Sequence, residues 1–338
     1  MYDKTQAELA ALVTDGVVPG VHYAFINGRT TEEHYFGYSE LKPDKKLLKA
    51  NQLYDLASLT KVIATTTLIL ELQEAGRLSV NDPLQWYIPS FQDSRVTLRH
   101  FLTHTSGISG YIPHRNSLSA AKLTYSLLGL TTGAGFGREV KYSDTGLIYC
   151  GWVIERLLHL PVQDALTQYV LRPLGMLNST FTPEKKLCVP ASYEPGGRGL
   201  IQGVVHDPKA HILGKHCGSA GLFAPMSDLI LFARFMLGDA LVPRPPISQT
   251  TINSLYHDYT GFSGGRSLGW NLKTSVEADQ HKLLFHTGYV GSFILLDGKK
   301  DAAFIFLSNR IHPIAPNEAY LAKRDHLIDT YLTEKAQE

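Results

Sequence analysis

Residues 58–76, SLTKVIATTTLILELQEAG, are the stretch of sequence on which the fold depends. The apolar residues of this stretch fall on more than one face of a helix: Val62, Ile63, Leu68, Ile69, Leu70 and Leu72. A helix that is apolar nearly all round is buried among other elements. The stretch therefore predicts a central, buried helix that begins near Ser58 and Lys61.

Strand patterns lie near both ends of the chain, and helical patterns lie between them. The first, HYAFINGRTTEEHYFGY, occupies residues 22–38, and the second, LLFHTGYVGSFILLDGKKDAAFIFLSNR, occupies residues 283–310. A single sheet built from both ends, with a helical insertion, accounts for this order better than two sequential domains. We therefore predict an α/β (α+β) fold. Residues 1–78 and 265–338 form an antiparallel sheet flanked by N- and C-terminal helices, and residues 79–264 form a large, mainly helical region.

Local patterns predict how the two ends are built. Thr5 and Glu8 have the T-x-x-E spacing of a capping box at the start of the first helix. Asn27-Gly28 predicts a hairpin with a type I′ turn, because both central residues of that turn need positive φ. In the last helix one stripe is apolar: Tyr320, Leu321, Leu327, Ile328, Tyr331 and Leu332.

Composition narrows the class of protein. The 338 residues carry 32 Lys and Arg against 31 Asp and Glu, so no excess of basic charge indicates a nucleic-acid or membrane partner. The start, MYDKTQAELAALVTDG, lacks the features of a signal peptide, and no apolar run approaches the roughly 18 residues of a membrane span. Three scattered cysteines do not form a disulfide framework. We expect a cytoplasmic protein and leave its oligomeric state open.

Ser58-Leu59-Thr60-Lys61 is the sharpest candidate for chemistry. Positions i and i+3 share one face of a helix, so the Ser58 hydroxyl and the Lys61 ammonium can meet. The helix N-terminus adds free N–H groups that can stabilise an oxyanion. The motif alone also fits a capping serine followed by a solvated lysine. However, a lysine in the first turn of an apolar helix would be buried, which is unfavourable for its charge unless the lysine has a partner or a function.

Two further motifs carry polar side chains next to apolar segments. Tyr142-Ser143-Asp144 precedes an apolar helical run, and His286-Thr287-Gly288 lies inside a predicted strand, where glycine commonly marks the close approach of a ligand or another backbone. Taken singly, the first also fits a turn before a helix and the second a structural strand histidine.

Two other patterns are weaker candidates. Residues 261–265, GFSGG, match G-x-S-x-G but lack the strand before and the helix after that this motif needs, so we interpret them as a loop. His206, His211 and His216 recur every five residues, which puts no two of them on one helix face. We predict neither a metal site nor an organic cofactor.

Together and in this order, the three motifs resemble those of the serine β-lactamase and penicillin-binding protein superfamily, S-x-x-K, Tyr-x-Asn and K/H-T-G. The resemblance is closest to the class C β-lactamase-like branch, which includes esterases and D-Ala-D-Ala carboxypeptidases. Similar stretches, such as LRHFLTHTSGISG at residues 98–110, extend it over about residues 20–313. It implies a β-lactamase/transpeptidase-like fold.

The same resemblance implies roles for individual residues. Ser58 would be the acylated nucleophile, Lys61 would lie beside it, and Tyr142 would be the general base and acid. The backbone N–H groups of Ser58 and Tyr289 would form the oxyanion hole. The residues implied in substrate binding are Asp144, His286, Thr287 and Gly288.

The sequence departs from the family pattern at two of these positions. Asp144 stands where Asn is common, and a carboxylate near Lys61 would raise the pKa of that lysine and shift the work of the base to Tyr142. His286 replaces the Lys of true β-lactamases. Because histidine is mostly neutral at pH 7, a substrate carboxylate would bind less well here.

The resemblance therefore predicts a serine hydrolase that forms a Ser58 acyl-enzyme, which water then hydrolyses. A carboxylic ester is the first expectation for its small-molecule substrate. The alternative is a peptide or β-lactam, as in a D-Ala-D-Ala carboxypeptidase or a weak β-lactamase. A non-catalytic ligand-binding protein of the same fold is a third hypothesis, disfavoured by the presence of the motif residues. Which of Lys61, Tyr142 and His286 is the operative base stays open.

Overall fold

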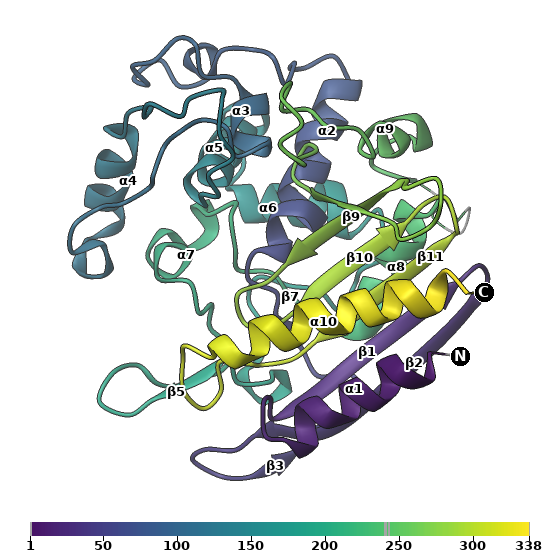
Figure 1. The fold of residues 1–338 in the computed structure, drawn as a ribbon. Coiled ribbons are helices and arrows are strands. Elements are labelled where there is room, and N and C mark those ends of the chain that lie inside the picture. The colour runs from purple at the N-terminus through teal and green to yellow at the C-terminus, as the bar shows by residue number, and fades with distance from the viewer. Residues whose placement is uncertain (1, 240–241, 243, 338) are drawn as a thin grey trace.

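A seven-stranded antiparallel sheet, in the order β3-β2-β1-β11-β10-β9-β8, forms the centre of the computed structural model, which describes residues 2–239, 242 and 244–337 (Figure 1). The first three strands come from one end of the chain and the last four from the other, as predicted. β1 joins the two halves by pairing with β11 on one side and with β2 on the other. The strands are β1 Gly20–Asn27, β2 Thr30–Glu40, β3 Lys46–Leu47, β8 Asn271–Thr274, β9 Lys282–Thr287, β10 Phe293–Asp297 and β11 Ala302–Leu307.

The β1–β2 hairpin is confirmed, but its turn is not the one predicted. Asn27 pairs with Thr30, so the two central residues are Gly28 and Arg29 rather than Asn27 and Gly28. Gly28 has φ +53°, and Arg29 is not among the residues with positive φ. A positive φ at the first central residue is the requirement of a type II′ turn, which glycine meets without strain.

Two helices, α1 (Asp3–Thr14) and α10 (Glu318–Lys335), lie side by side over one face of the sheet (Figure 1). The predicted stripe of α10 is confirmed: Tyr320, Leu327, Ile328, Tyr331 and Leu332 are buried, and Leu321 is partly buried. These side chains share a core with the aromatic residues of β1, β10 and β11. This face of the sheet is therefore closed by the two ends of the chain.

The capping box predicted at Thr5 and Glu8 is wrong. The helix begins at Asp3, so Thr5 lies inside its first turns. The Thr5 hydroxyl donates to Glu334 of α10 at 2.7 Å, and Glu8 accepts from Thr330 at 2.7 Å. Both side chains thus join α1 to α10, a partner that local spacing could not indicate.

The other face of the sheet is covered by the mainly helical region (Figure 1). Residues 61–74 form its buried centre, as a π-helical segment (Lys61–Thr66) that continues into α2 (Thr67–Glu74). The region also contains β5 (Ser192–Glu194), β6 (Gly199–Ile201) and β7 (Phe223–Ala224), and β7 pairs with β4 (Tyr54–Asp55). Its other helices are α3 Leu98–Leu102, α4 Ala120–Leu128, α5 Thr145–Leu158, α6 Val162–Leu166, α7 Pro208–Leu213, α8 Met226–Met236 and α9 Gln249–Ser254.

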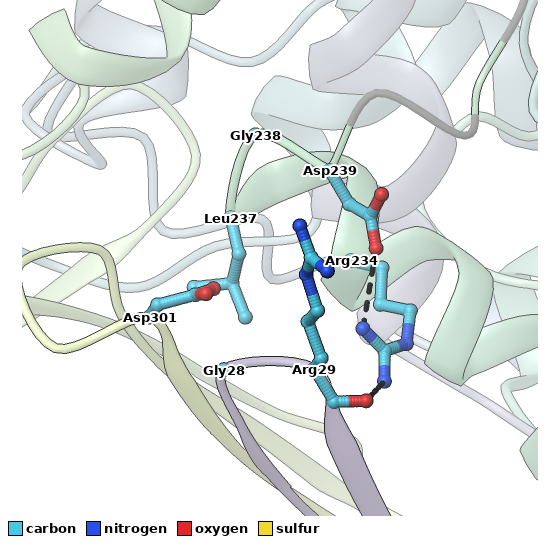
Figure 2. Close-up of a pocket in the computed structure, with 7 residues that line it drawn as sticks. All are labelled: Gly28, Arg29, Arg234, Leu237, Gly238, Asp239 and Asp301. Carbon is cyan, nitrogen blue, oxygen red and sulfur yellow. Dashed lines mark hydrogen bonds and ion pairs between the residues drawn. The ribbon is translucent and has the colours of Figure 1, made fainter.

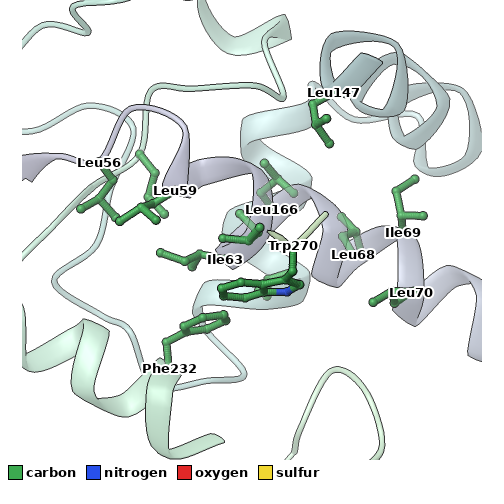
Figure 3. Close-up of a cluster of buried hydrophobic side chains, with 14 of the residues drawn as sticks. Leu56, Leu59, Ile63, Leu68, Ile69, Leu70, Leu147, Leu166, Phe232 and Trp270 are labelled. Carbon is green, nitrogen blue, oxygen red and sulfur yellow. The ribbon is translucent and has the colours of Figure 1, made fainter. Parts of the chain in front are cut away.

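The predicted all-round burial of the central helix is confirmed, since every residue from 61 to 70 is buried. Figure 3 shows Ile63 and Leu68 among side chains from three other elements: Leu147 of α5, Leu166 of α6 and Phe232 of α8. Such burial holds the N-terminal end of the helix, with Ser58 and Lys61, in one place. Among the described residues, no helix is long and apolar enough to cross a membrane.

Candidate active site

Ser58 and Lys61 meet at the start of the central helix. The Lys61 Nζ lies 2.7 Å from the Ser58 Oγ and donates a second hydrogen bond of 2.8 Å to the Ser219 carbonyl oxygen. The side chain of Lys61 is 1% exposed, so its ammonium is held inside the protein, whereas Ser58 is half-buried. A buried cation thus lies beside the hydroxyl of this serine.

Ser58 opens into a cavity of about 390 Å³. Tyr142 and Asp144, which precede α5, reach the same cavity, and Tyr289 enters it from the segment after β9. Residues that are far apart in the sequence are thereby brought together where the helical region meets the sheet. The other lining residues are Ala57, Arg115, His206, Asp207, Pro208 and Ala220.

Asp144 lies between two lysines. Its carboxylate oxygens are 2.8 Å from the Nζ atoms of Lys61 and of Lys209 in α7. Burial alone would raise the pKa of Asp144, but the two ammonium groups hold it below its usual value. Sequence reasoning missed Lys209, although a lysine in the first turn of a short helix next to His206-Asp207 was visible.

The same contacts keep Lys61 charged. Burial acts to lower the pKa of Lys61, but the charge and hydrogen bonding of Asp144 and Tyr142 outweigh it and raise the pKa above the usual value. This is the direction expected from a carboxylate at position 144. A lysine that stays protonated donates hydrogen bonds and cannot take the proton of Ser58.

Tyr142 is 44% exposed and lies in an irregular segment just before α5. Cations approach its ring, with the Lys61 Nζ 5.5 Å and the Arg266 guanidinium 5.8 Å from the ring centroid. Its side chain therefore lies at the cavity, with two cationic side chains near its ring.

The side chain of His286 is placed differently from its neighbours in the motif. It is 4% exposed and is not among the residues that line the cavity. Its ring centroid lies 6.3 Å from that of Tyr142, and its Nδ1 is 3.0 Å from the Thr287 carbonyl oxygen. Burial, with the nearby charges of Lys61 and Arg266, lowers the pKa of His286 to about 3. The ring is a neutral, buried neighbour of Tyr142.

Gly288 is required by close packing. A Cβ at this position would come within 2.5 Å of the Leu56 carbonyl oxygen, two residues before Ser58. The end of β9 therefore approaches the Ser58 turn as closely as backbone atoms allow. Half-buried Thr287 precedes this contact, and Tyr289 follows it at the cavity.

The backbone N–H groups of Ser58 and Tyr289 have no hydrogen-bond acceptor among the described residues. Arg310 holds the Tyr289 segment, because its Nε donates to the Tyr289 carbonyl oxygen at 2.9 Å. By contrast, Ser263 of the G-x-S-x-G match is an exposed loop residue with φ +59° and is not among the residues that line the cavity.

Asp55 is a further site residue that sequence reasoning missed. It is 2% exposed, and its two oxygens accept the N–H groups of Ala57 at 2.9 Å and of His206 at 2.7 Å. Ala57, directly before Ser58, has φ +45°, an unfavourable value for a residue with a Cβ. Asp55 thus joins the strained turn of the nucleophile to the opposite wall of the cavity.

We expect Asp55→Asn to lower kcat/KM. The carboxylate accepts the N–H groups of Ala57 and His206 with its two oxygens, whereas an amide has one oxygen and would turn its NH₂ group toward the second N–H.

Burial raises the pKa of Asp55 to about 6. The folded state therefore holds a proton that the unfolded chain has lost at about pH 4–6, and this contribution to stability disappears as the pH rises through about 6. The free energy of unfolding of the wild type minus that of Asp55→Asn should increase as the pH is lowered from about 7 to 4.5.

Denaturant unfolding at both pH values checks this expectation, with Asp329→Asn on the exposed side of α10 as the control. A difference in stability that is independent of pH would show that Asp55 does not titrate in this range.

A second cavity, of about 740 Å³, lies near the β1–β2 turn (Figure 2). Arg234 is held there by Asp239 at 3.2 Å and by the Arg29 carbonyl oxygen at 3.0 Å. The cavity is larger than the one at Ser58, but the described residues that line it include no Ser, Cys, His or Tyr. Size alone would therefore have indicated the wrong place.

A family model described as Beta-lactamase matches residues 5–327 of the chain. A protein of Salmonella enteritidis PT4 named as a D-alanyl-D-alanine carboxypeptidase is 26% identical over 307 residues, which cover 78% of this chain and 71% of that protein. An N-acetylmuramyl-L-alanine amidase of Bacillus subtilis (strain 168) is 23% identical, covering 85% of this chain and 76% of that protein.

Solved structures share the fold at low sequence identity. A mutant class C β-lactamase superposes with a TM-score of 0.79 at 18% identity, covering 98% of this chain and 97% of the other. The hydrolase EstCE1, described as having promiscuous acyltransferase activity, superposes with a TM-score of 0.74 at 18% identity, covering 97% of each chain.

Proposed function

The chain belongs to the β-lactamase family and is a serine hydrolase, and on that premise we propose that it hydrolyses carboxylic esters through an acyl-enzyme on Ser58. The observation that carries the proposal is the 2.7 Å contact between the Lys61 Nζ and the Ser58 Oγ, in a cavity that Tyr142 also lines.

Acylation requires a base for the Ser58 hydroxyl. Because Lys61 stays charged, we assign this role to the phenol oxygen of Tyr142, which lines the same cavity. The Ser58 Oγ bonds to the carbonyl carbon while its proton passes to Tyr142. The negative charge on the carbonyl oxygen is stabilised by the N–H groups of Ser58 and Tyr289, which no other described residue occupies.

The proton then moves from Tyr142 to the leaving oxygen, and the alcohol departs from the Ser58 ester. In the second half of the reaction, water attacks the acyl carbon and gives its proton to Tyr142. That proton returns to the Ser58 Oγ as the acid leaves, so that the starting state is restored.

The preference for esters rests on the charge next to the nucleophile. His286 is buried and neutral, so it offers a substrate carboxylate no cation at the position where a lysine would do so. A neutral ester needs no such partner. An alcohol is also an easier leaving group than an amine, so ester cleavage depends less on proton donation to the leaving atom.

One observation favours the second candidate, a carboxypeptidase that acts on peptides with a free carboxylate. Arg115 lines the cavity, and its guanidinium makes no hydrogen bond or ion pair with any described residue. An unpaired guanidinium at the mouth of the cavity could bind a carboxylate in a bidentate manner. The relative named as a D-alanyl-D-alanine carboxypeptidase supports the same candidate.

A panel of three substrates separates the two candidates: a short-chain nitrophenyl ester, a chromogenic cephalosporin and a D-Ala-D-Ala peptide. We expect the highest kcat/KM for the ester, with the acyl group found on Ser58 by mass spectrometry. Faster hydrolysis of the peptide than of the ester would replace the first candidate by the second.

Arg115→Gln is expected to change kcat/KM for the nitrophenyl ester by less than about threefold, because a neutral ester offers the guanidinium no anion. For the peptide we expect a rise in KM of about tenfold, the loss of one charged hydrogen-bonded contact of about 1.5 kcal/mol. Arg138→Gln, outside the cavity lining, is the control. Equal effects on both substrates would exclude Arg115 as a carboxylate ligand.

A further inference from the structure

The position of Tyr142 is not explained by regular secondary structure. Residues 141–143 form neither helix nor strand, and α5 begins only at Thr145. A proton carrier has to hold its oxygen near the hydroxyl of the nucleophile, since a misplacement of about 1 Å can cost about 10² in rate. Contacts from elsewhere in the chain must therefore fix this segment.

His104, which follows α3, makes three contacts that bracket Tyr142. Its carbonyl oxygen accepts the N–H of Lys141 at 2.8 Å, and its Nδ1 accepts the N–H of Ser143 at 3.3 Å. Its ring packs on the ring of Tyr142, with centroids 4.4 Å apart and planes at 37°. One residue thus holds the backbone on both sides of Tyr142 and the phenol ring itself.

The histidine is retained at an energetic cost. It is 2% exposed and has φ +56°, and its Nε2 is buried without a hydrogen-bond partner among the described residues. Burial, together with the charges of Arg266 and Lys61, lowers its pKa well below the usual value, so the ring is neutral. With Nδ1 accepting from Ser143, the proton is on Nε2, where a buried N–H without an acceptor is unfavourable.

A phenylalanine would pack on Tyr142 without that cost, but it could not accept the Ser143 N–H. The feature that only the histidine supplies is therefore the Nδ1 lone pair. We propose that His104 is a positioning residue that fixes Tyr142 in the cavity at Ser58 through this hydrogen bond and the packing of its ring. The inference rests on the proposed function only in that Tyr142 carries the proton.

The chain contains a close match for His104 that does not contact Tyr142. His100 in α3 stacks on the ring of Phe136 with centroids 4.7 Å apart, and its Nδ1 accepts the N–H of Thr97 at 3.1 Å. It too has a pKa lowered by burial, to about 4. Substitutions at His100 therefore report the structural cost of losing such a histidine without disturbing the candidate site.

Four variants measured with the nitrophenyl ester test the kinetic consequence: His104→Ala, His104→Asn, His100→Ala and His100→Asn. His104→Ala should lower kcat by about ten- to a hundredfold and change KM by less than about threefold. His104→Asn should recover most of that loss, because the Asn oxygen replaces the Nδ1 acceptor and Asn tolerates positive φ. The His100 variants should keep kcat within about threefold of the wild type.

A second measurement is independent of activity. In protein labelled with 3-fluorotyrosine, the ¹⁹F resonance that disappears in Tyr142→Phe belongs to Tyr142. We expect one sharp resonance in the wild type, in His104→Asn and in His100→Ala, and a broadened or split one in His104→Ala. Its number and width are the readout, since loss of the His104 ring current changes its position in any case.

The two measurements separate the two hypotheses. A single sharp Tyr142 resonance in His104→Ala overturns the positioning role, and so does a kcat in His104→Ala no lower than in His100→Ala. A His104→Asn variant as slow as His104→Ala overturns the role of the Nδ1 acceptor. If Ser58 of the wild type were never acylated, the proposed function would fail, while the ¹⁹F spectra would still decide whether His104 fixes Tyr142.

Discussion

Ser58→Ala is expected to abolish ester hydrolysis and to prevent labelling by a serine-directed fluorophosphonate. The hydroxyl is the nucleophile, and in serine hydrolases its removal costs up to about 10⁶ in kcat. The variant should fold, because the Lys61 ammonium keeps its bonds to Asp144 and to the Ser219 carbonyl oxygen. Residual turnover measured with the nitrophenyl ester gives the size of the loss, and mass spectrometry locates the label.

Ser263→Ala is the matched control for this substitution. Ser263 is the serine of the G-x-S-x-G match and lies in an exposed loop, so its loss should leave both hydrolysis and labelling unchanged. A label found on Ser263 or Ser106 of the wild type, with Ser58 unmodified, would contradict the assignment of the nucleophile.

Tyr142→Phe should lower kcat by at least about 10², the low end of a general acid–base contribution. The substitution removes one oxygen and leaves the ring, so its packing on the His104 ring, with centroids 4.4 Å apart, is preserved. The loss can then be attributed to proton transfer. We expect acylation by the fluorophosphonate to slow in parallel, because the same oxygen takes the Ser58 proton in both reactions.

Tyr125→Phe controls for the chemical change itself, since Tyr125 is 82% exposed on α4. Single-turnover kinetics would show whether acylation or deacylation is slowed. Turnover of Tyr142→Phe close to that of the wild type would exclude the phenol as the base. The proton of Ser58 would then have to pass to Lys61, in spite of the ion pair that keeps this lysine charged.

Several features could be predicted from the sequence because their causes are local. The apolar residues of 58–76 require burial whatever surrounds them, and strand patterns at both ends require a sheet that joins the ends. The spacing of Ser58 and Lys61 puts them on one face of any helix, so their contact did not depend on the rest of the fold. The family resemblance, rather than local spacing, placed Asp144 near Lys61 and so indicated the direction of the Lys61 pKa.

Other features depended on the tertiary structure because their partners are distant in the sequence. Thr5 has the spacing of a cap, yet its hydroxyl pairs with Glu334, which only the packing of α1 on α10 brings near. Asp55 accepts a hydrogen bond from the N–H of His206, 151 positions away. Lys209 donates to Asp144, 65 positions away. The hydrophobic periodicity of a sequence does not indicate contacts between residues so far apart.

His286 is a residue whose surroundings could not be predicted from the sequence. The ring is neutral, as the sequence predicted, but it is buried against Tyr142 and Trp270 and is not among the residues that line the cavity. The types and order of the motif residues indicated the family, and the resemblance implied Ser58 as the nucleophile. Only the contact between Ser58 and Lys61 follows from short-range geometry. Only the fold decided which side chains face the cavity and which hold Tyr142, because burial and long-range pairing set those properties.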